Sequence, residues 1–312
     1  MEVFATLDVG SNSVKLHVAG RDRVGNWQVL RDQDEIARLS EGLQATGKIS
    51  EAAMQRNTDV ICDFVSEARK LGARHILAVG TMGLRTASNA PAFIDWVKQN
   101  CGLEIEVISG EEEARLAFLG ALSGLPSLAG EIGVFDIGGG STEFIFGRDS
   151  LISERFSLDV GAVRLTEVYL RSDPVTSNEL RRMLDVVDDE LSNQLGGEKA
   201  ELRNGRQVDT LVGIGGTMTN LSAIKIKLAT YNQQVLQGST LTRQDIDGLL
   251  EIFRARTIAQ RKDIIGLQPK RADVILAGAG IAKVVMQKLS AERLVVSAQG
   301  VRHGLLADRF GK

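Results

Sequence analysis

The sequence predicts an α/β protein made of two related domains, because one strand–turn–strand pattern occurs in it twice. Residues 3–8 are an apolar run, and its last residue, Asp8, begins the sequence D-V-G-S-N-S at 8–13. Residues 134–146 read V-F-D-I-G-G-G-S-T-E-F-I-F. In both, an Asp ends the first apolar run and a glycine turn leads into the next strand, as in a tight hairpin. A third element, T-L-V-G-I-G-G-T at 210–217, also runs from a strand into glycines.

The two hairpin patterns align residue by residue, which indicates a duplication. With residue 8 placed on residue 136, the matched pairs are Asp8 and Asp136, Gly10 and Gly138, Ser13 and Ser141, Leu16 and Phe144, and Val18 and Phe146. A repeat of this kind can define an architecture. We therefore expect a duplicated domain whose two glycine loops face each other across a cleft.

The first half of the chain alternates strands with helices. We expect strands at 3–8, 14–19, 27–31, 75–79 and 104–108, and helices at 50–71, 90–100 and 109–120. The helix at 50–71 starts with a serine, has apolar residues at helical spacing and is followed by Gly72 as a C-cap. Arg85 follows the carboxyl end of the 75–79 strand, where ligands gather in open α/β sheets. By position alone it could equally be an exposed helix residue.

Three consecutive acids open the helix at 109–120, which reads S-G-E-E-E-A-R-L-A-F-L-G. Carboxylates in a first turn interact favourably with the helix dipole, by a few tenths to about 1 kcal/mol each. This accounts for one or two of the acids. It does not explain why all three lie between two candidate phosphate loops.

The second half continues the alternation. A turn-rich stretch at 124–130 is the expected domain boundary, and residues 196–207 are polar and are expected to form a surface loop. We expect strands at 151–158 and 294–296, a helix near Gly161, helices at 177–195, 242–256 and 270–288, and a terminal helix. The third glycine element opens a helix, which aims N–H groups at an anion or nucleotide. We assign residues 1–125 to the first domain, which the terminal helix at about 300–312 could rejoin, and residues 126–299 to the second.

Composition and charge exclude several classes of protein. The chain has 312 residues, 43% hydrophobic and 25% charged, which is ordinary for a globular protein of two domains. A net charge of −3 gives no general attraction to nucleic acids or membranes. Cys62 and Cys101 have no metal-type spacing. Without a signal-peptide pattern or a run of about 20 apolar residues, we expect a cytoplasmic protein with no nucleic-acid or membrane partner.

The glycine turns and carboxylates of the sequence favour phosphoryl transfer to water. The sequence has no G-x-x-x-x-G-K-[ST], H-E-x-x-H or G-x-S-x-G motif and no zinc-type Cys/His cluster. His17 and His75 lie in expected strands, and we interpret them as structural. Glycine turns bind phosphate through backbone N–H groups, carboxylates hold Mg²⁺, and one carboxylate can activate water. The same turns could also be tight hairpins that bind no ligand.

Seven motifs, in order along the chain, together resemble one family. They are D-V-G-S-N-S at 8–13, T-x-x-x-R-x-A at 81–87, S-G-E-E-E-A-R-L at 109–116, D-I-G-G-G-S-T-E at 136–143, G-A-V-R-L-T-E at 161–167, G-I-G-G-T at 213–217 and R-A-D-V-I-L-A-G at 271–278. The first, third and fourth are highly specific in combination. On these motifs the chain resembles the Ppx/GppA family of exopolyphosphatases and guanosine pentaphosphate phosphohydrolases, from residue 3 to about residue 306.

The resemblance implies a fold and a set of roles. The family belongs to the actin-like superfamily, which includes sugar kinases and heat-shock ATPases, with two ribonuclease H-like domains flanking a catalytic cleft. Glu113 would be the catalytic base, Arg85 would contact the terminal phosphate, and Glu143 would position water or the metal. Asp8 and Asp136, with Glu143, would hold Mg²⁺, although other divalent cations could serve. The implied phosphate-binding residues are Ser11, Asn12, Ser13, Gly138, Gly139, Gly140, Ser141, Thr142, Gly215, Gly216 and Thr217.

The sequence departs from the family's pattern in two places. Longer members carry a C-terminal HD-like domain that helps to hold long polyphosphate; this sequence ends at Lys312, so we expect the short two-domain form. Short polyphosphate or a nucleotide could then be the better substrate. The last motif reads G-V-R-H-G, with His303 where an acidic residue is common, and we assign no catalytic role to His303.

Several functions stay open from the sequence. The leading expectation is Mg²⁺-dependent release of terminal orthophosphate from inorganic polyphosphate. The alternative is hydrolysis of the 5′ γ-phosphate of guanosine pentaphosphate, or of a nucleoside di- or triphosphate, by the same residues. A non-catalytic actin-like nucleotide-binding protein would keep the glycine loops without needing Glu113, and a sugar kinase fits the acid-rich helix start less well. The resemblance also implies a homodimer.

Overall fold

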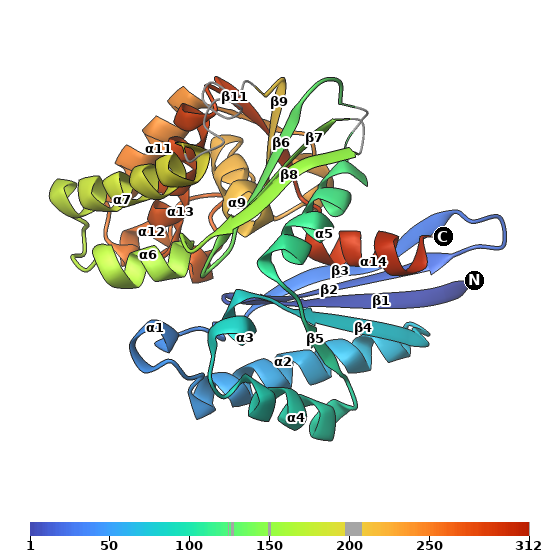
Figure 1. The fold of residues 1–312 in the computed structure, drawn as a ribbon. Helices are drawn as coiled ribbons and strands as arrows, with labels where there is room; N and C mark the ends of the chain where they lie inside the picture. Colours follow the sequence, from blue (N-terminus) through green and yellow to red (C-terminus); the bar gives the residue numbers. More distant parts are fainter. Residues whose placement is uncertain (124, 126–127, 149–150, 197–207, 312) are drawn as a thin grey trace. The chain divides into compact units, whose positions relative to one another are not determined.

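Each of the two units into which the computed structural model divides has its own sheet and its own core (Figure 1). Unit 1 comprises Met1–Gly120 and Val301–Lys312, and unit 2 comprises Ala121–Gly300. The structure describes residues 1–123, 125, 128–148, 151–196 and 208–311. Part of the expected boundary at 124–130 and nearly all of the expected polar loop at 196–207 therefore lie outside the described residues.

Unit 1 contains a five-stranded mixed sheet in the order β3-β2-β1-β4-β5. Its strands are β1 (Glu2–Val9), β2 (Ser13–Arg21), β3 (Trp27–Ile36), β4 (His75–Gly80) and β5 (Ile105–Val107). The β1–β2 and β2–β3 pairs are antiparallel, whereas β1–β4 and β4–β5 are parallel. β1 is therefore the central strand, and its carboxyl end leads into the first glycine turn.

Helices cover both faces of the unit 1 sheet. They are α1 (Leu43–Thr46), α2 (Glu51–Lys70), α3 (Met82–Thr86), α4 (Ala90–Cys101), α5 (Gly110–Ser123) and α14 (Val301–Phe310). Alternate residues of β1, from Val3 to Val9, point into a core that includes residues of α2 and α4. Phe4 points to the opposite face, where it packs with Leu306 of α14. β1 is thus buried on both sides.

Unit 2 repeats this topology. Its sheet has the order β10-β11-β9-β6-β7-β8. The strands are β6 (Ile132–Ile137), β7 (Thr142–Arg148), β8 (Leu151–Leu158), β9 (Thr210–Ile214), β10 (Thr240–Thr242) and β11 (Arg293–Ser297). Two antiparallel pairings (β8–β7, β7–β6) are followed by two parallel ones (β6–β9, β9–β11), as in unit 1, and β10 is an added antiparallel edge strand. The predicted duplicated α/β fold is confirmed, and its strand order is the ribonuclease H-like order.

The core of unit 2 is organised around α13, which contacts α6, α7, α9 and α11. The helices are α6 (Ala162–Tyr169), α7 (Ser177–Gly196), α9 (Gly215–Lys225), α10 (Gln233–Leu236), α11 (Arg243–Arg254), α12 (Ile258–Arg261), the 3₁₀ helix η1 (Pro269–Arg271) and α13 (Ile275–Lys288). Most residues of α13 are buried. Among the helices that the structure describes, none combines the length and apolarity needed to cross a bilayer.

The start of the helix predicted at 270–288 was wrong. Pro269–Arg271 form a 3₁₀ turn, and α13 begins only at Ile275. The Arg271 side chain is buried, and its guanidinium lies against Gly216. A tertiary contact of this kind overrides local helix propensity, which is a weak preference.

β3 extends to Ile36, five residues beyond the predicted end at residue 31. Asp32 and Asp34 are poor strand formers, so the local pattern ends before them. The strand register places Asp32 opposite His17 and Asp34 opposite Lys15 on β2. A cross-strand pair of opposite charge, here Asp34 with Lys15, stabilises a strand that propensity alone disfavours.

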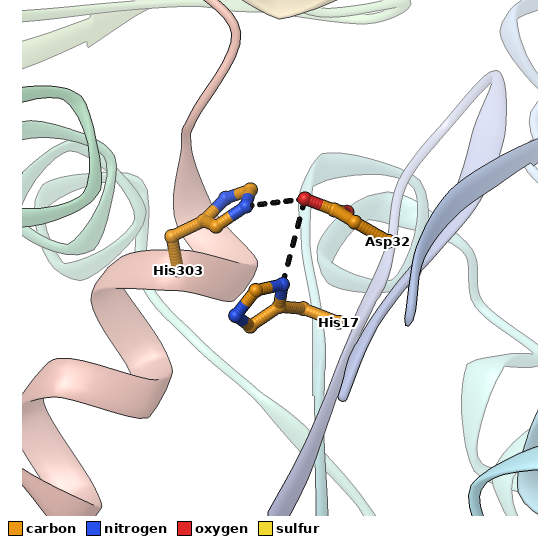
Figure 2. A group of neighbouring side chains, drawn as sticks. All are labelled: His17, Asp32 and His303. Atoms are coloured by element: carbon orange, nitrogen blue, oxygen red, sulfur yellow. Dashed lines mark hydrogen bonds and ion pairs between the residues drawn. The ribbon is translucent and has the colours of Figure 1, made fainter. Parts of the chain in front are cut away.

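The C-terminal helix α14 is joined to the unit 1 sheet by a buried polar group that we call the Asp32 cluster: Asp32, His17, Arg302 and His303. Asp32 Oδ1 lies 2.7 Å from both Nε and Nη2 of Arg302. Asp32 Oδ2 lies 2.7 Å from His303 Nε2 and 3.4 Å from His17 Nδ1 (Figure 2). All four side chains are nine-tenths buried or more. One carboxylate therefore connects β2, β3 and α14.

The members of the Asp32 cluster set one another's charge. Burial acts to raise the pKa of Asp32, but the charge of Arg302, the adjacent His17 imidazole and a hydrogen bond with His303 hold it well below its usual range. Burial and the charge of Arg302 lower the pKa of His303 from 6.5 to about 3, against the opposing effect of its hydrogen bond to Asp32. At neutral pH the cluster is an Asp32–Arg302 ion pair with a neutral His303.

Asp32→Asn should destabilise unit 1 by about 3 kcal/mol, because it leaves the buried Arg302 guanidinium without its counter-charge. Both tryptophans of the chain, Trp27 and Trp96, belong to unit 1, so their fluorescence during urea unfolding reports on this unit. Asp59→Asn, at an exposed position of α2, is the control and should change stability by less than about 0.5 kcal/mol. Equal unfolding midpoints for the two variants would contradict the anchoring role of Asp32.

Candidate active site

The first glycine loop, residues 10–13, joins β1 to β2 and is held by backbone hydrogen bonds. Gly10 N–H donates to the Ser13 carbonyl at 3.0 Å, which closes the turn. The Asn12 carbonyl accepts from the N–H groups of Ala37 and Arg38 at 3.1 and 2.9 Å. All three loop residues after Gly10, which the sequence predicted to bind phosphate, are buried. The loop presents its polar groups from a fixed backbone, as a preformed anion site requires.

Asp8 is the second-last residue of β1, next to this loop, and only one of its oxygens has a hydrogen-bond partner among the described residues. Oδ2 accepts from Lys15 Nζ at 2.8 Å, across the β1–β2 pair. Oδ1 is buried and makes no hydrogen bond to any residue that the structure describes. A buried oxygen without a hydrogen bond lowers the stability of the folded protein. It is available to a divalent cation, the role that the sequence predicted for Asp8.

Glu113 and Arg85, predicted from separate motifs, form an ion pair within unit 1. Arg85 Nη1 lies 2.7 Å from Glu113 Oε2 and 3.0 Å from the Ile108 carbonyl. Arg85 is on α3, which follows β4, and Glu113 is in the first turn of α5, which follows β5. Since β1, β4 and β5 are parallel neighbours, their carboxyl ends lie at the same edge of the sheet as the first glycine loop.

Burial distinguishes Glu113 from the two acids that precede it. Glu111 is exposed. Glu112 accepts two hydrogen bonds from Arg115 at 2.8 Å, and these lower its pKa. Glu113 is only 8% exposed and is held by Arg85. A surface role at the helix start explains the first two acids. A buried carboxylate positioned by a guanidinium suits proton transfer.

The second glycine loop, residues 138–141 in unit 2, repeats the turn of the first. Gly138 N–H donates to the Ser141 carbonyl at 2.9 Å, which is the same bond that Gly10 makes to Ser13 in unit 1. An added Cβ at either glycine would lie 3.0 Å from the carbonyl oxygen of its serine partner. The sequence match between the two hairpins therefore extends to their backbone geometry.

The carbonyls of this second loop are occupied by α6. Those of Gly138 and Gly139 accept N–H groups from the first turn of α6 at 2.9 to 3.1 Å. Gly161, which precedes α6, packs so closely that a Cβ there would lie 2.4 Å from the backbone of residues 139–140. The N–H groups of Gly139 and Gly140 donate to no described residue. They are the groups with which this loop can bind an anion.

Two carboxylates face each other across the second hairpin. Asp136 on β6 pairs directly with Glu143 on β7. Glu143 Oε1 accepts hydrogen bonds from Ser157 Oγ at 3.0 Å and from Ser141 Oγ. Neighbouring carboxylates repel each other, and a divalent cation relieves that repulsion. The Thr142 hydroxyl, predicted to bind phosphate, donates to the carbonyl of Val160.

The third glycine element, between β9 and α9, meets Asp136. Gly215 has φ +82°, in the left-handed region that glycine favours, and a Cβ there would lie 2.2 Å from Asp136 Oδ1. A Cβ on Gly216 would lie 2.2 Å from the Arg271 guanidinium. Thr217 is buried against Gly278 of α13. Within unit 2 the third loop and the second hairpin thus share one carboxylate.

Two residues of these sites were missed by the sequence analysis. Lys15, which holds Asp8, stands in the first hairpin where Glu143 stands in the second. Arg271 belongs to the R-A-D motif, to which the sequence analysis gave no role, and its Nε donates to Gln268 Oε1 at 3.0 Å. The hairpin alignment contains Lys15 and the R-A-D motif contains Arg271, but only the contacts in the structure show what these side chains do.

Each unit therefore presents a glycine loop with a carboxylate at its edge. Unit 1 adds the part-buried Arg85–Glu113 ion pair, and unit 2 adds the Asp136–Glu143 pair. Backbone N–H groups and carboxylate oxygens are the groups that bind phosphate and hard divalent cations. The expectation that the two loops face each other across a cleft stays a prediction.

Comparisons with known proteins give one family. The model described as the Ppx/GppA phosphatase family matches residues 17–312. The chain is 31% identical to a Mycobacterium tuberculosis protein named Exopolyphosphatase 2, over 98% of this chain and 98% of that protein. It is 30% identical to the guanosine-5′-triphosphate,3′-diphosphate pyrophosphatase of Photobacterium profundum, over 99% of this chain and 60% of that protein. The crystal structure of the Aquifex aeolicus Ppx/GppA family member superposes with a TM-score of 0.81, at 32% identity, over 98% of this chain and 97% of that one.

Gly161→Ala should destabilise unit 2 by about 1–3 kcal/mol, because the added methyl group must displace the second glycine loop. Calorimetry should show a lower Tm, and hydrogen exchange should show faster exchange in residues 137–142. Gly248→Ala in α11 is the matched control, since an added Cβ there meets nothing within 4 Å, and it should be neutral or slightly stabilising. Unchanged exchange at the loop in Gly161→Ala would disprove the proposed packing.

Proposed function

Because the chain belongs to the Ppx/GppA phosphatase family, we propose that it is an exopolyphosphatase that releases terminal orthophosphate from inorganic polyphosphate. Water attacks the terminal phosphoryl group, and Mg²⁺ is the cofactor. The observation that carries this proposal is the ion pair between the part-buried Arg85 and the buried Glu113, at the sheet edge where the first glycine loop begins. Similarity along the full chain to a protein named Exopolyphosphatase 2 supports the substrate class.

Glu113 is the proposed general base. Its burial keeps the carboxylate away from bulk water, and Arg85 holds Oε2 at 2.7 Å, so the side chain has one preferred orientation. A base placed to take the proton of attacking water contributes about 10²–10⁴-fold to a rate. The same guanidinium can contact an oxygen of the terminal phosphate, which would place the phosphoryl group next to the base.

The glycine loops are the proposed phosphate sites. Their N–H groups come from turns closed by the backbone itself, so little reorganisation is needed when charge develops on the phosphoryl oxygens. Positioning and electrostatic stabilisation are most of what phosphoryl transfer requires from a protein. Gly139 and Gly140 in unit 2, and Ser11 to Ser13 in unit 1, carry this role in the proposal.

Asp8, Asp136 and Glu143 are the proposed ligands of the metal. Asp8 Oδ1 is buried without a hydrogen bond among the described residues, and Asp136 and Glu143 are cross-strand neighbours. These are oxygen donors only, which suits Mg²⁺ better than a softer metal. When bound, the cation would neutralise phosphate charge and stabilise the leaving group.

Hydrolysis of guanosine pentaphosphate, or of a nucleoside di- or triphosphate, is the second candidate. The third glycine element favours it, because helix N-termini bind nucleotide phosphates and α9 begins at Gly215. The buried Arg271 guanidinium against Gly216 adds a positive charge there. The sequence identity of 30% to the guanosine-5′-triphosphate,3′-diphosphate pyrophosphatase of Photobacterium profundum also supports a guanosine nucleotide as substrate.

A non-catalytic nucleotide-binding protein would belong to a different class. It would use the glycine loops but would have no need for a buried carboxylate held by an arginine, so the Glu113 environment favours an enzyme.

We further propose that the protein acts in the cytoplasm as a homodimer. Sedimentation at several concentrations tests the oligomeric state.

Glu113→Gln should lower kcat by about 10²–10⁴-fold and leave substrate Kd within a few-fold, because the amide keeps the shape of the side chain but cannot accept the proton of water. Phosphate release and calorimetric binding measure the two quantities. Glu111→Gln changes an exposed acid in the same helical turn and should keep wild-type activity. Wild-type turnover in Glu113→Gln would remove Glu113 from the mechanism.

Substrate preference separates the two enzymatic candidates. We expect kcat/KM for short inorganic polyphosphates to exceed kcat/KM for guanosine pentaphosphate when both are assayed with Mg²⁺. Polyphosphates of several lengths, guanosine pentaphosphate and GTP form the comparison set. A higher kcat/KM for the guanosine nucleotide would reverse the ranking and favour the second candidate.

A further inference from the structure

Three side chains of the Asp32 cluster have the chemistry of a metal site, separate from the proposed active-site groups. His17 on β2, Asp32 on β3 and His303 on α14 each offer one ligand atom, and these atoms lie within 4.8 Å of one another. The strand register places His17 opposite Asp32. The helix then brings His303 to the same carboxylate (Figure 2). No spacing motif in the sequence connects the three residues.

The distances suit a small transition-metal dication. Asp32 Oδ2 lies 2.7 Å from His303 Nε2 and 3.4 Å from His17 Nδ1. In a tetrahedral Zn²⁺ site with bonds of about 2.0–2.2 Å, neighbouring ligand atoms are roughly 3.3 Å apart. The His17–Asp32 separation is already close to this value. His303 and Asp32 would have to separate by roughly half an ångström to admit the ion.

His17 Nδ1 is the least satisfied atom of the cluster. It is buried, and its 3.4 Å approach to Asp32 lacks hydrogen-bond geometry, so it has no hydrogen bond within the described part of the chain. The His17 and His303 rings are only 4.4 Å apart between centroids. A buried ring nitrogen that points at a carboxylate oxygen, beside a second imidazole, is placed as a metal ligand is placed.

The surroundings hold the carboxylate in the orientation that a metal would need. Arg302 occupies Oδ1 through Nε and Nη2, so Oδ2 is the oxygen directed at the two imidazoles. Thr6 Oγ1 donates to the Arg302 carbonyl at 2.7 Å, which fixes the first turn of α14 against β1. Hydrogen-bonded groups of this kind orient the direct ligands in metal sites.

The charged groups near the Asp32 cluster are compatible with a bound cation. Burial acts to lower the pKa of Arg302, but the attraction of Asp32, Asp34 and Asp8 raises it overall. Lys15, paired with Asp8, is the second cation of this group. These three carboxylates outnumber the two cations before any metal binds. The positive charge of Arg302 is therefore more than balanced.

We propose that His17, Asp32 and His303 bind one Zn²⁺-type cation that fastens α14 to the unit 1 sheet. Two imidazoles and a carboxylate favour Zn²⁺ or Co²⁺ over Mg²⁺, and one tetrahedral position is left for water. The ligands come together only in the folded chain, so the metal stabilises unit 1 by mass action. The proposal does not depend on the proposed function.

Cobalt(II) tests the site in the full chain, because four-coordinate Co²⁺ absorbs visible light and accepts the ligands that Zn²⁺ accepts. Protein freed of metal by a chelator should take up one equivalent of Co²⁺ with these absorption bands. Zn²⁺ should displace it, and millimolar Mg²⁺ should not. Zn²⁺ should also raise the Tm of unit 1, followed by tryptophan fluorescence, by several degrees. No stoichiometric uptake, or uptake that Mg²⁺ abolishes, overturns the proposal.

Single variants locate the ligands. His303→Gln keeps an N–H donor near the position of Nε2, and His17→Asn does the same for Nδ1, so each removes an imidazole but can keep the contact with Asp32. Each should weaken Co²⁺ binding by at least about 100-fold. His75→Gln is the matched control, at a half-exposed histidine of β4 in the same unit. Wild-type Co²⁺ binding in the first two variants would show that the cluster is only a hydrogen-bonded ion pair.

The wild-type protein provides a readout that does not depend on how the variants fold. The chain has three histidines, so long-range ¹H–¹⁵N spectra can resolve every imidazole. One equivalent of Zn²⁺ should shift ring nitrogens of His17 and His303 and leave those of His75 in place. Unshifted signals from His17 and His303 would equally overturn the proposal.

Discussion

The structure depends on one backbone hydrogen bond, which occurs once in each unit. Gly10 N–H to the Ser13 carbonyl and Gly138 N–H to the Ser141 carbonyl close the turns that follow the central strands β1 and β6. Because each turn is tight, the next strand pairs antiparallel on one side, and the parallel strands are added on the other. The carboxyl ends of the parallel strands then lie at the same sheet edge as the loop. In unit 1 this edge also carries Glu113.

The two units have the same hairpin backbone, but the charged side chains across the hairpin differ. Across the first hairpin Asp8 faces Lys15, whereas across the second Asp136 faces Glu143. The first pair is an ion pair, and the second brings together two carboxylates, an arrangement that a divalent cation stabilises. A single cross-strand position thus gives the duplicated fold two unlike loops. The hairpin alignment contains this difference, but its meaning comes from the strand register.

Buried and part-buried ion pairs connect parts of unit 1 that are distant in the sequence. Arg85 and Glu113 are 28 residues apart, and Asp32 and Arg302 are 270 residues apart. Removing one partner of such a pair leaves an uncompensated buried charge, which is strongly destabilising. The same contacts that orient a candidate base and a candidate metal ligand therefore also hold α5 and α14 in place. Function and stability are linked at these positions.

The sequence by itself determined the duplicated α/β fold, the glycine turns and the choice of Glu113 and Arg85 as candidates. The fold and the turns follow from apolar periodicity and glycine placement, and the two candidates follow from the resemblance of the motifs to those of the Ppx/GppA family. Only the tertiary structure decided that β3 continues through Asp32, that Arg271 lies against Gly216, and that a single carboxylate joins α14 to the sheet. Burial of apolar residues and backbone preference leave a periodic trace along the chain, whereas an ion pair between distant residues leaves none.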